Sequence, residues 1–162
     1  MNDITISSAH EADVPVILRM INGLAEYERL SHQVVATEDS LRETLFGPRP
    51  AAEVVLAYDG DEPVGFALFF HNYSTFMGRP GLYLEDLFVV PSWRGRGVGR
   101  LLLTHLAAIA VERRCGRMEW AVLDWNESAI GFYRRLGASL LDDWRICRLT
   151  GDALVRAASA AV

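Results

Sequence analysis

The hydrophobic pattern in the first third of the chain predicts one strand followed by two helices. Ile4 and Ile6 alternate with polar neighbours, as in a short half-buried strand. Apolar residues then recur at intervals of three and four along residues 12–29, which predicts an amphipathic helix with one buried face. A shorter helix is expected over residues 37–45, with Thr37 as its N-cap.

The middle of the chain is typical of an antiparallel hairpin followed by a further strand. Residues 54–58 and 63–70 are rich in β-forming side chains and flank a strong turn signal, Asp-Gly-Asp-Glu, at residues 59–62. We expect residues 72–81 to form a loop and residues 82–90 to form the next strand.

Simple alternation along this last strand separates its side chains into two faces. One face is expected to carry Tyr83, Glu85, Leu87 and Val89. The other face is expected to carry Leu84, Asp86, Phe88 and Val90. Two acids on opposite faces of an apolar strand are unusual.

The second half of the chain alternates between strands and helices. A helix is expected to end near Arg113 and another to span residues 126–136. Further strands are expected at residues 118–124, 138–141 and 144–149, before a small-residue tail at 157–162 that is expected to fray. Together these elements predict one α/β domain over residues 1–162, with a mixed sheet.

Composition narrows the class of protein. The 162 residues carry 16 Lys and Arg against 21 Asp and Glu, a formal net charge of −5. A nucleic-acid binder needs an excess of positive charge, so this balance disfavours one and suits a cationic partner. The apolar runs are shorter than the roughly 18–20 residues of a membrane span, and the N-terminus lacks a secretory pattern. We therefore expect a cytoplasmic protein that binds neither nucleic acid nor membrane.

The cysteines and histidines do not predict a metal site. Cys115 and Cys147 lie far apart in the sequence, and the four histidines include no pair at a ligand spacing. We expect two reduced thiols and no bound metal.

The segment after the strand at 82–90 is the most informative motif. Residues 94–100 (Arg-Gly-Arg-Gly-Val-Gly-Arg) place three glycines among arginines at the start of a helix. A helix N-terminus presents unpaired N–H groups, and glycines let a phosphate approach them. A phosphate cradle is therefore favoured over a purely structural turn. The dinucleotide fingerprint fails at Arg100, and no P-loop sequence occurs.

The pattern Arg94-x-x-Gly97-x-Gly99 resembles the pyrophosphate loop of the GNAT acetyltransferases, which bind acetyl coenzyme A. This resemblance implies the GNAT fold, an α/β architecture with a central mixed, mostly antiparallel β-sheet flanked by helices. It also implies acetyl coenzyme A as cosubstrate, no metal, and a homodimer.

Further segments are similar to the diamine acetyltransferases, the spermidine/spermine and thialysine branch of that family. They are Leu-Tyr-Leu-Glu-Asp in the strand from residue 82, Trp-Asn-Glu at residues 125–127, the helix sequence at 132–138, and Leu-Ala-Glu-Tyr-Glu at 24–28. Residues 141–144 are shorter than the corresponding stretch of that branch, which leaves the substrate open.

The resemblance implies two catalytic roles. An alkyl ammonium, with a pKa of about 10.4, must lose a proton before its nitrogen attacks a thioester. Glu85 is the candidate base, acting through water, and Tyr133 is the candidate acid that protonates the departing sulfur. Two alternatives stay open: Glu85 as one partner of an ion pair, and Tyr133 as an ordinary half-buried aromatic. Asp86 is expected to have a structural or supporting role.

Positions that the resemblance assigns to the cosubstrate lie on the strand, the glycine loop and the helix from residue 126. They are Leu87, Phe88, Val89, Arg94, Gly95, Arg96, Gly97, Val98, Gly99, Arg100, Asn126, Ser128, Ala129, Tyr133 and Arg135. The backbone N–H groups of residues 87–89 are expected to stabilise the oxyanion. Helical spacing places Asn126, Ile130 and Tyr133 on one face.

Tyr27 and Glu28, together with Glu85, match positions that contact the amine in the resembling branch. A solvated helix end explains the first two equally well. We expect transfer of an acetyl group to a primary amine of a small cationic molecule, such as a polyamine, a diamine or a thialysine-like or lysine-like compound, by direct attack in a ternary complex. The alternatives are acetylation of a protein lysine or N-terminus, and a non-catalytic sensor of acyl coenzyme A.

Overall fold

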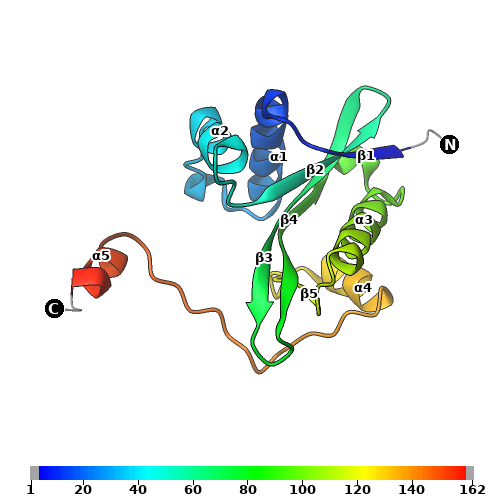
Figure 1. Ribbon diagram of the computed structural model, residues 1–162. Helices are drawn as coiled ribbons and strands as arrows, with labels where there is room; N and C mark the ends of the chain where they lie inside the picture. Colours follow the sequence, from blue (N-terminus) through cyan, green and yellow to red (C-terminus); the bar gives the residue numbers. More distant parts are fainter. Residues whose placement is uncertain (1–3, 160–162) are drawn as a thin grey trace. The chain divides into compact units, whose positions relative to one another are not determined.

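A computed structural model describes residues 4–159 and divides the chain into two compact units, residues 1–121 and 122–162. The first unit contains a five-stranded sheet in the order β1-β2-β3-β4-β5 (Figure 1). The strands are β1 (Ile4–Ser8), β2 (Glu53–Asp59), β3 (Glu62–Ser74), β4 (Arg79–Val89) and β5 (Met118–Trp120). Neighbouring strands are antiparallel except for the parallel pair of β4 and β5, so the predicted mixed, mostly antiparallel sheet is confirmed.

Helices cover both faces of this sheet. The helices α1 (Val14–Tyr27) and α2 (Glu38–Phe46) lie on one face, and α3 (Val98–Glu112) lies on the other (Figure 1). The predicted cap of α2 is present, because the Ser40 amide donates to the Thr37 hydroxyl at 3.2 Å. The core under α1 and α2 is apolar. Its buried residues are Val14, Ile17, Met20, Leu41, Leu45, Val54, Leu56, Phe66 and Phe88.

The hairpin between β3 and β4 is longer than the sequence predicted. We expected residues 72–81 to form a loop, but Asn72 pairs with Gly81 and Ser74 pairs with Arg79. Only residues 75–78 turn, with Gly78 at a φ of 60°. Residues 72–81 contain several polar residues, one proline and two glycines, which are typical of a loop, whereas pairing with the neighbouring strand holds most of them in the sheet.

A β-bulge in β4 overturns the predicted alternation of its side chains. Leu68 pairs with Asp86 and the next residue, Phe69, pairs with Leu84, so Glu85 is an extra residue without a partner in the register. Directly paired residues share a face of a sheet. Asp86 therefore lies on the same face as Leu68, which packs into the core under α1 and α2.

The bulge sorts the remaining β4 side chains in the same way. Tyr83 pairs with Phe70 and Phe88 pairs with Phe66, which puts both on the face of α1 and α2. Val89 pairs with Gly65, where an added Cβ would meet Leu102 of α3. Glu85 is thus not aligned with Leu87 and Val89, as strict alternation required. The alternation of side chains between the two faces of the sheet is therefore interrupted at residue 85.

The second unit contains α4 (Glu127–Arg135) and α5 (Gly151–Ser159). The predicted helix at 126–136 is confirmed, with Asn126 as its N-cap. The strands predicted at 138–141 and 144–149 are not formed, because no strand pairs with this segment among the described residues. Part of the predicted tail is helical, since α5 reaches Ser159, and residues 160–162 lie outside the described part. The prediction of a single domain stays a prediction.

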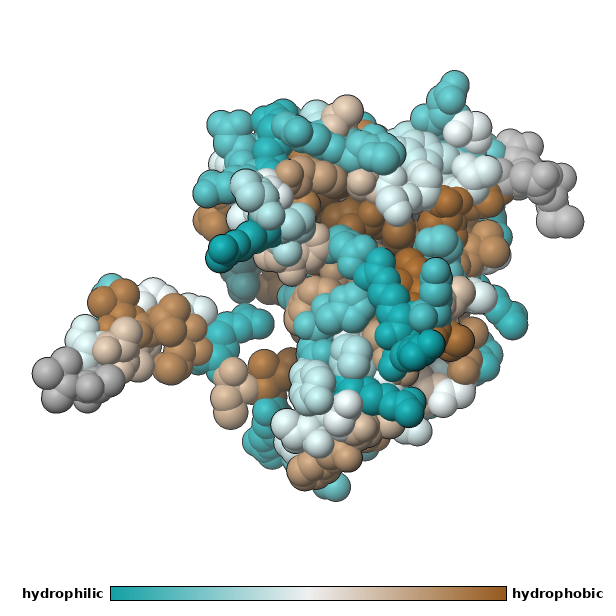
Figure 2. All heavy atoms as spheres, viewed as in Figure 1, coloured by the Kyte–Doolittle hydropathy of each residue, from teal (hydrophilic) through white to brown (hydrophobic). Residues whose placement is uncertain are grey.

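Several apolar side chains of the second unit are exposed. Figure 2 shows such residues in brown on α5, where Leu154 is 54% and Val155 is 64% exposed. Trp144 and Ile146, in the stretch before α5, are 80% and 73% exposed. No helix within residues 4–159 combines the length and the hydropathy that a membrane span requires.

Candidate active site

The free edge of β4 is the first feature of the candidate site. β5 pairs with β4 only from Leu82 to Leu84, while β4 continues to Val89. The Val90 amide donates to Val64 on β3, so the main-chain groups of Val89 point to the opposite side, where β5 has ended. The same geometry applies to Leu87, which lies two residues earlier. An extended ligand with amide groups can add to this edge as a further strand does.

The glycine loop forms the second feature, directly after β4. Gly95 and Gly97 have positive φ angles of 74° and 88°, a region that other residues rarely adopt. A Cβ at either position would meet nothing within 4 Å, so both glycines border open space. Gly97 is the N-cap of α3 and supplies no side-chain cap to the N–H groups of the first turn. These N–H groups and the helix dipole fit a phosphate ligand.

The arginines of this loop are placed differently from one another. Arg96 lies over the Trp93 ring, 4.7 Å from its centroid, within the loop itself. The Arg94 side chain turns back instead, and its Nε donates to the Val89 carbonyl at 3.0 Å. Its guanidinium also lies 4.3 Å from the Tyr27 ring centroid and 5.5 Å from that of Phe88.

An acidic cluster occupies the face of β4 that carries Asp86. Burial raises the pKa of Asp86 to about 6, and the negative charges of Glu85 and Glu28 act in the same direction. Burial also raises the pKa of Glu28, at the C-terminal end of α1. Three carboxyl groups from two elements are therefore close enough to interact. Such a cluster attracts a cationic group.

Aromatic side chains adjoin the cluster. The Phe70 and Tyr83 rings lie 5.2 Å apart on the same sheet face, and Tyr27, at the end of α1, is 38% exposed. Burial and the nearby charges of Glu85 and Glu119 raise the pKa of the Tyr83 hydroxyl. The alkyl chain of an amine substrate can pack on such rings while its ammonium group meets the acids.

The second unit carries the remaining predicted site residues on α4. The Asn126 side chain accepts from the Ala129 amide at 3.2 Å, so its oxygen caps the helix. Ile130 is buried and Tyr133 is half-buried, with the Phe132 ring 5.4 Å from that of Tyr133. The other predicted site residues on this helix are Ser128 and Arg135, which are exposed, and Ala129, which is half-buried.

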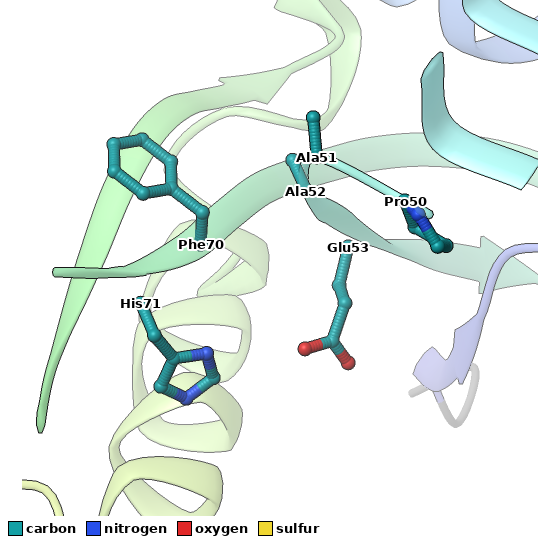
Figure 3. Close-up of a pocket in the computed structure, with 6 residues that line it drawn as sticks. All are labelled: Pro50, Ala51, Ala52, Glu53, Phe70 and His71. Carbon is teal, nitrogen blue, oxygen red and sulfur yellow. The ribbon is translucent and has the colours of Figure 1, made fainter. Parts of the chain in front are cut away.

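The first unit also has a hollow, which is lined by Pro50, Ala51, Ala52, Glu53, Phe70 and His71. Figure 3 shows it at the start of β2 and the middle of β3, where Glu53 and His71 point to the same side and Phe70 points to the other. The Glu53 carboxylate is held there by Arg113, whose NH2 group donates at 2.8 Å. Among the predicted site residues, none lines this hollow. Within the described part of the chain, no group of three or more His, Cys, Asp or Glu could hold a metal ion.

Two features of this region were not predicted from the sequence. Simple alternation placed Asp86 on the face opposite to Glu85, and the bulge at Glu85 removes that separation. The contact between Arg94 and Tyr27 was also missed, since it joins segments far apart in the chain. An interruption of alternation by two adjacent acids was the only local sign of the bulge.

Comparisons with known proteins identify the family of this chain. A family model described as the acetyltransferase (GNAT) family matches residues 20–138. The chain is 40% identical over 160 residues to thialysine N-epsilon-acetyltransferase of Mus musculus, covering 92% of this chain and 94% of that protein. It is 37% identical over 194 residues to L-ornithine N5-acetyltransferase of Arabidopsis thaliana, covering 92% and 85%.

A solved structure is similar over nearly the whole chain. It is an integron cassette protein from the mobile metagenome of V. cholerae, with a TM-score of 0.81, 28% identity, and coverage of 98% of both chains. The chain therefore belongs to the acetyltransferase (GNAT) family, and the predicted enzyme class, an amine N-acetyltransferase, is confirmed.

Proposed function

We propose that this enzyme transfers the acetyl group of acetyl coenzyme A to a primary amine of a small dicationic or polycationic molecule, by direct attack in a ternary complex. The observation that carries the proposal is the cluster of Glu28, Glu85 and Asp86 beside the free edge of β4, in a chain of the GNAT family. Relatives named for thialysine and ornithine acetylation support the same substrate class.

Each end of the reaction has its own residues. The N–H groups of the first turn of α3 and of Gly95 and Gly97 hold the pyrophosphate of the donor, and the main-chain groups of Leu87 and Val89 hold its pantetheine arm. The carboxylates of Glu28 and Asp86 attract the ammonium groups of the acceptor.

The transfer then needs one base, one acid and one oxyanion donor. Glu85 accepts the ammonium proton through a water molecule, which frees the nitrogen lone pair to attack the thioester carbonyl carbon. A carbon–nitrogen bond forms and the carbon–sulfur bond breaks. The N–H groups of Leu87 and Val89, which point away from β3, stabilise the negative charge on the carbonyl oxygen. The Tyr133 hydroxyl protonates the leaving thiolate. The attacking nitrogen releases its second proton to solvent as the amide forms, and Tyr133 regains a proton from solvent.

An amine panel tests the substrate class. The protein is incubated with acetyl coenzyme A and, separately, thialysine, L-ornithine, spermidine, a monoamine and a lysine-containing peptide. Thiol release gives the rate, and mass spectrometry identifies the acetylated product. We expect turnover of the free diamines and polyamine. Turnover of the peptide alone would assign the enzyme to protein acetylation instead.

Two isosteric variants separate the acids. Glu85→Gln removes the base, and we expect kcat to fall by about a hundredfold, a usual contribution of general base catalysis. Asp86→Asn keeps the base and removes one charge of the cluster, so we expect KM for the diamine to rise and kcat to change less. An unchanged kcat in Glu85→Gln would remove Glu85 from the mechanism.

The homodimer and the cytoplasmic location are further parts of this proposal. Exposed apolar side chains on the second unit, such as Trp144 and Leu154, favour an association between copies. Light scattering coupled to size exclusion measures the mass in solution, and a monomeric mass at micromolar concentration would contradict the dimer.

A further inference from the structure

Arg94 makes two kinds of contact, a hydrogen bond to the main chain and contacts with two aromatic rings. Its Nε donates in the guanidinium plane to the Val89 carbonyl at 3.0 Å. The central guanidinium carbon of the same side chain lies over two rings, 4.3 Å from the Tyr27 centroid and 5.5 Å from the Phe88 centroid. A guanidinium can make in-plane hydrogen bonds and stack on rings at the same time, because it is planar and its charge is delocalised.

These contacts connect the two halves of the proposed site. The Val89 carbonyl belongs to the free edge of β4, where the donor is expected to bind. Tyr27 ends α1, and the following residue, Glu28, belongs to the acidic cluster that is expected to bind the amine. Phe88 packs under α1, close to Gly23, where an added Cβ would lie 2.8 Å from its ring. Arg94 therefore reaches from the donor loop to the end of α1.

We propose that Arg94 is a positioning residue for the acceptor amine, which fixes Tyr27 and the end of α1 against β4, and that its side chain is not a phosphate ligand. The inference rests on the proposed function and deepens it. In this arrangement the first arginine of the loop serves the amine half of the site, and the main-chain N–H groups of the loop serve the donor half.

The chemistry of lysine separates the two roles. A phosphate ligand needs a positive charge within reach, and a lysine supplies that charge. The positioning role needs a planar group that bonds the Val89 carbonyl and at the same time lies over the Tyr27 and Phe88 rings, and a lysine lacks that geometry. Arg94→Lys therefore keeps what phosphate binding requires and removes what positioning requires. Arg94→Gln additionally removes the charge.

The experiment measures each half of the site in the same variants. Isothermal titration with coenzyme A gives the donor affinity, and steady-state kinetics with thialysine at saturating acetyl coenzyme A gives KM and kcat for the amine. For both Arg94→Lys and Arg94→Gln we expect a donor Kd within about twofold of wild type, and a KM for the amine raised by about threefold to tenfold, as loss of stacking implies.

Two further variants test whether the effect on KM for the amine comes from the contact between Arg94 and Tyr27. Tyr27→Leu should raise KM for the amine as Arg94→Lys does, and the double variant should be less impaired than the product of the two single effects, because both remove one contact. Arg96→Gln removes a charge from the same loop but leaves the Tyr27 contact, so it should weaken coenzyme A binding without raising KM for thialysine. Matched melting curves show that each variant is folded.

The outcomes are distinguishable. A tenfold loss of coenzyme A affinity in Arg94→Gln overturns the inference, because it would identify the side chain as a phosphate ligand. An unchanged KM for thialysine in both Arg94 variants overturns it as well, with the proposed function intact. Wild-type protein that binds no coenzyme A would instead end the proposed function, and the inference with it.

Discussion

Among single residues, Asp86 has a carboxyl group whose charged form is disfavoured by the fold. Its pKa rises to about 6, because the group is buried and lies within range of the negative charges of Glu85 and Glu28. An unfolded aspartate ionises near pH 3.8, so the folded state holds a proton that the unfolded state has lost between these two values. The charged carboxyl therefore lowers stability above pH 6, and this penalty disappears as the pH falls toward 4.

Asp86→Asn should consequently stabilise the protein in a pH-dependent way. Above pH 7 we expect the variant to be more stable by up to about 3 kcal/mol, since a pKa that differs by one between the folded and unfolded states changes the free energy of unfolding by about 1.36 kcal/mol. The difference should vanish near pH 4. Urea unfolding at a series of pH values measures it. Asp61→Asn, at an exposed turn, is the control for loss of one charge, and an equal gain at every pH in Asp86→Asn would contradict the assignment.

Tyr133 can be tested by removing one oxygen atom. In Tyr133→Phe the ring and its packing beside Phe132 remain, and the hydroxyl that is the proposed proton donor is lost. We expect kcat to fall by about tenfold to a hundredfold with little change in KM, as for loss of a general acid. Tyr73→Phe, at an exposed position of the hairpin, should behave like wild type. A kcat equal to that of wild type in Tyr133→Phe would show that Tyr133 is not the acid that protonates the leaving thiolate.

At the scale of elements, α1 and β4 approach each other closely at Gly23. An ordinary helix interior is stabilised by about 0.5–1 kcal/mol when glycine is replaced by alanine. At Gly23, however, the new Cβ would lie 2.8 Å from the buried Phe88 ring, which has to move. Gly131 in α4 has only the end of the Arg135 side chain nearby, at 3.4 Å.

The two glycines should respond to the same substitution with opposite signs. We expect Gly23→Ala to destabilise the protein by about 1–2 kcal/mol, because the cost of overpacking exceeds the gain in helix propensity. The amine KM should rise too, because Phe88 contacts Arg94. Gly131→Ala should be neutral or stabilising. Urea unfolding compares the pair, and a stable Gly23→Ala variant would show that Phe88 has room to move.

The elements differ in how far the sequence could predict them. The amphipathic helices α1 and α3 were predicted well, because a buried stripe repeats with the helical period. The bulge at Glu85 and the pairing of Asn72 with Gly81 were not, because both depend on the neighbouring strand. Trp144 and Ile146 were assigned to a strand on composition, but a strand also needs an edge to pair with.

In the candidate site, too, features formed by consecutive residues could be predicted from the sequence, and contacts between distant segments could not. The glycine loop was found because its residues are consecutive and glycine has a specific backbone role, which Gly95 and Gly97 fulfil with positive φ angles. The acids of the cluster come from α1 and β4, and only the fold shows which of them face each other. Arg94 was recognised as part of the loop, while its direction toward Tyr27 could not be derived from the loop sequence.

At the scale of the whole molecule, the net charge of −5 should assist the capture of a cationic substrate. The effect should weaken as salt shortens the range of the field, from about 10 Å at 0.1 M to about 3 Å at 1 M. We expect KM for a diamine to rise by about threefold or more over this range, and KM for a monoamine to rise less. Initial rates at several ionic strengths test this. Equal salt dependence for both amines would argue against an acidic amine site.

The early end of β5 has a consequence for how this family can diversify. Beyond Leu84, β4 offers a ligand its peptide groups, which are the same whatever side chain each position carries. Binding of acetyl coenzyme A through these main-chain groups would be retained after most substitutions along β4. Substitution of the acidic and aromatic residues of the proposed amine site would then change which amine is accepted. The binding of acetyl coenzyme A would stay the same, so new acceptor specificities would evolve without changes in the donor site.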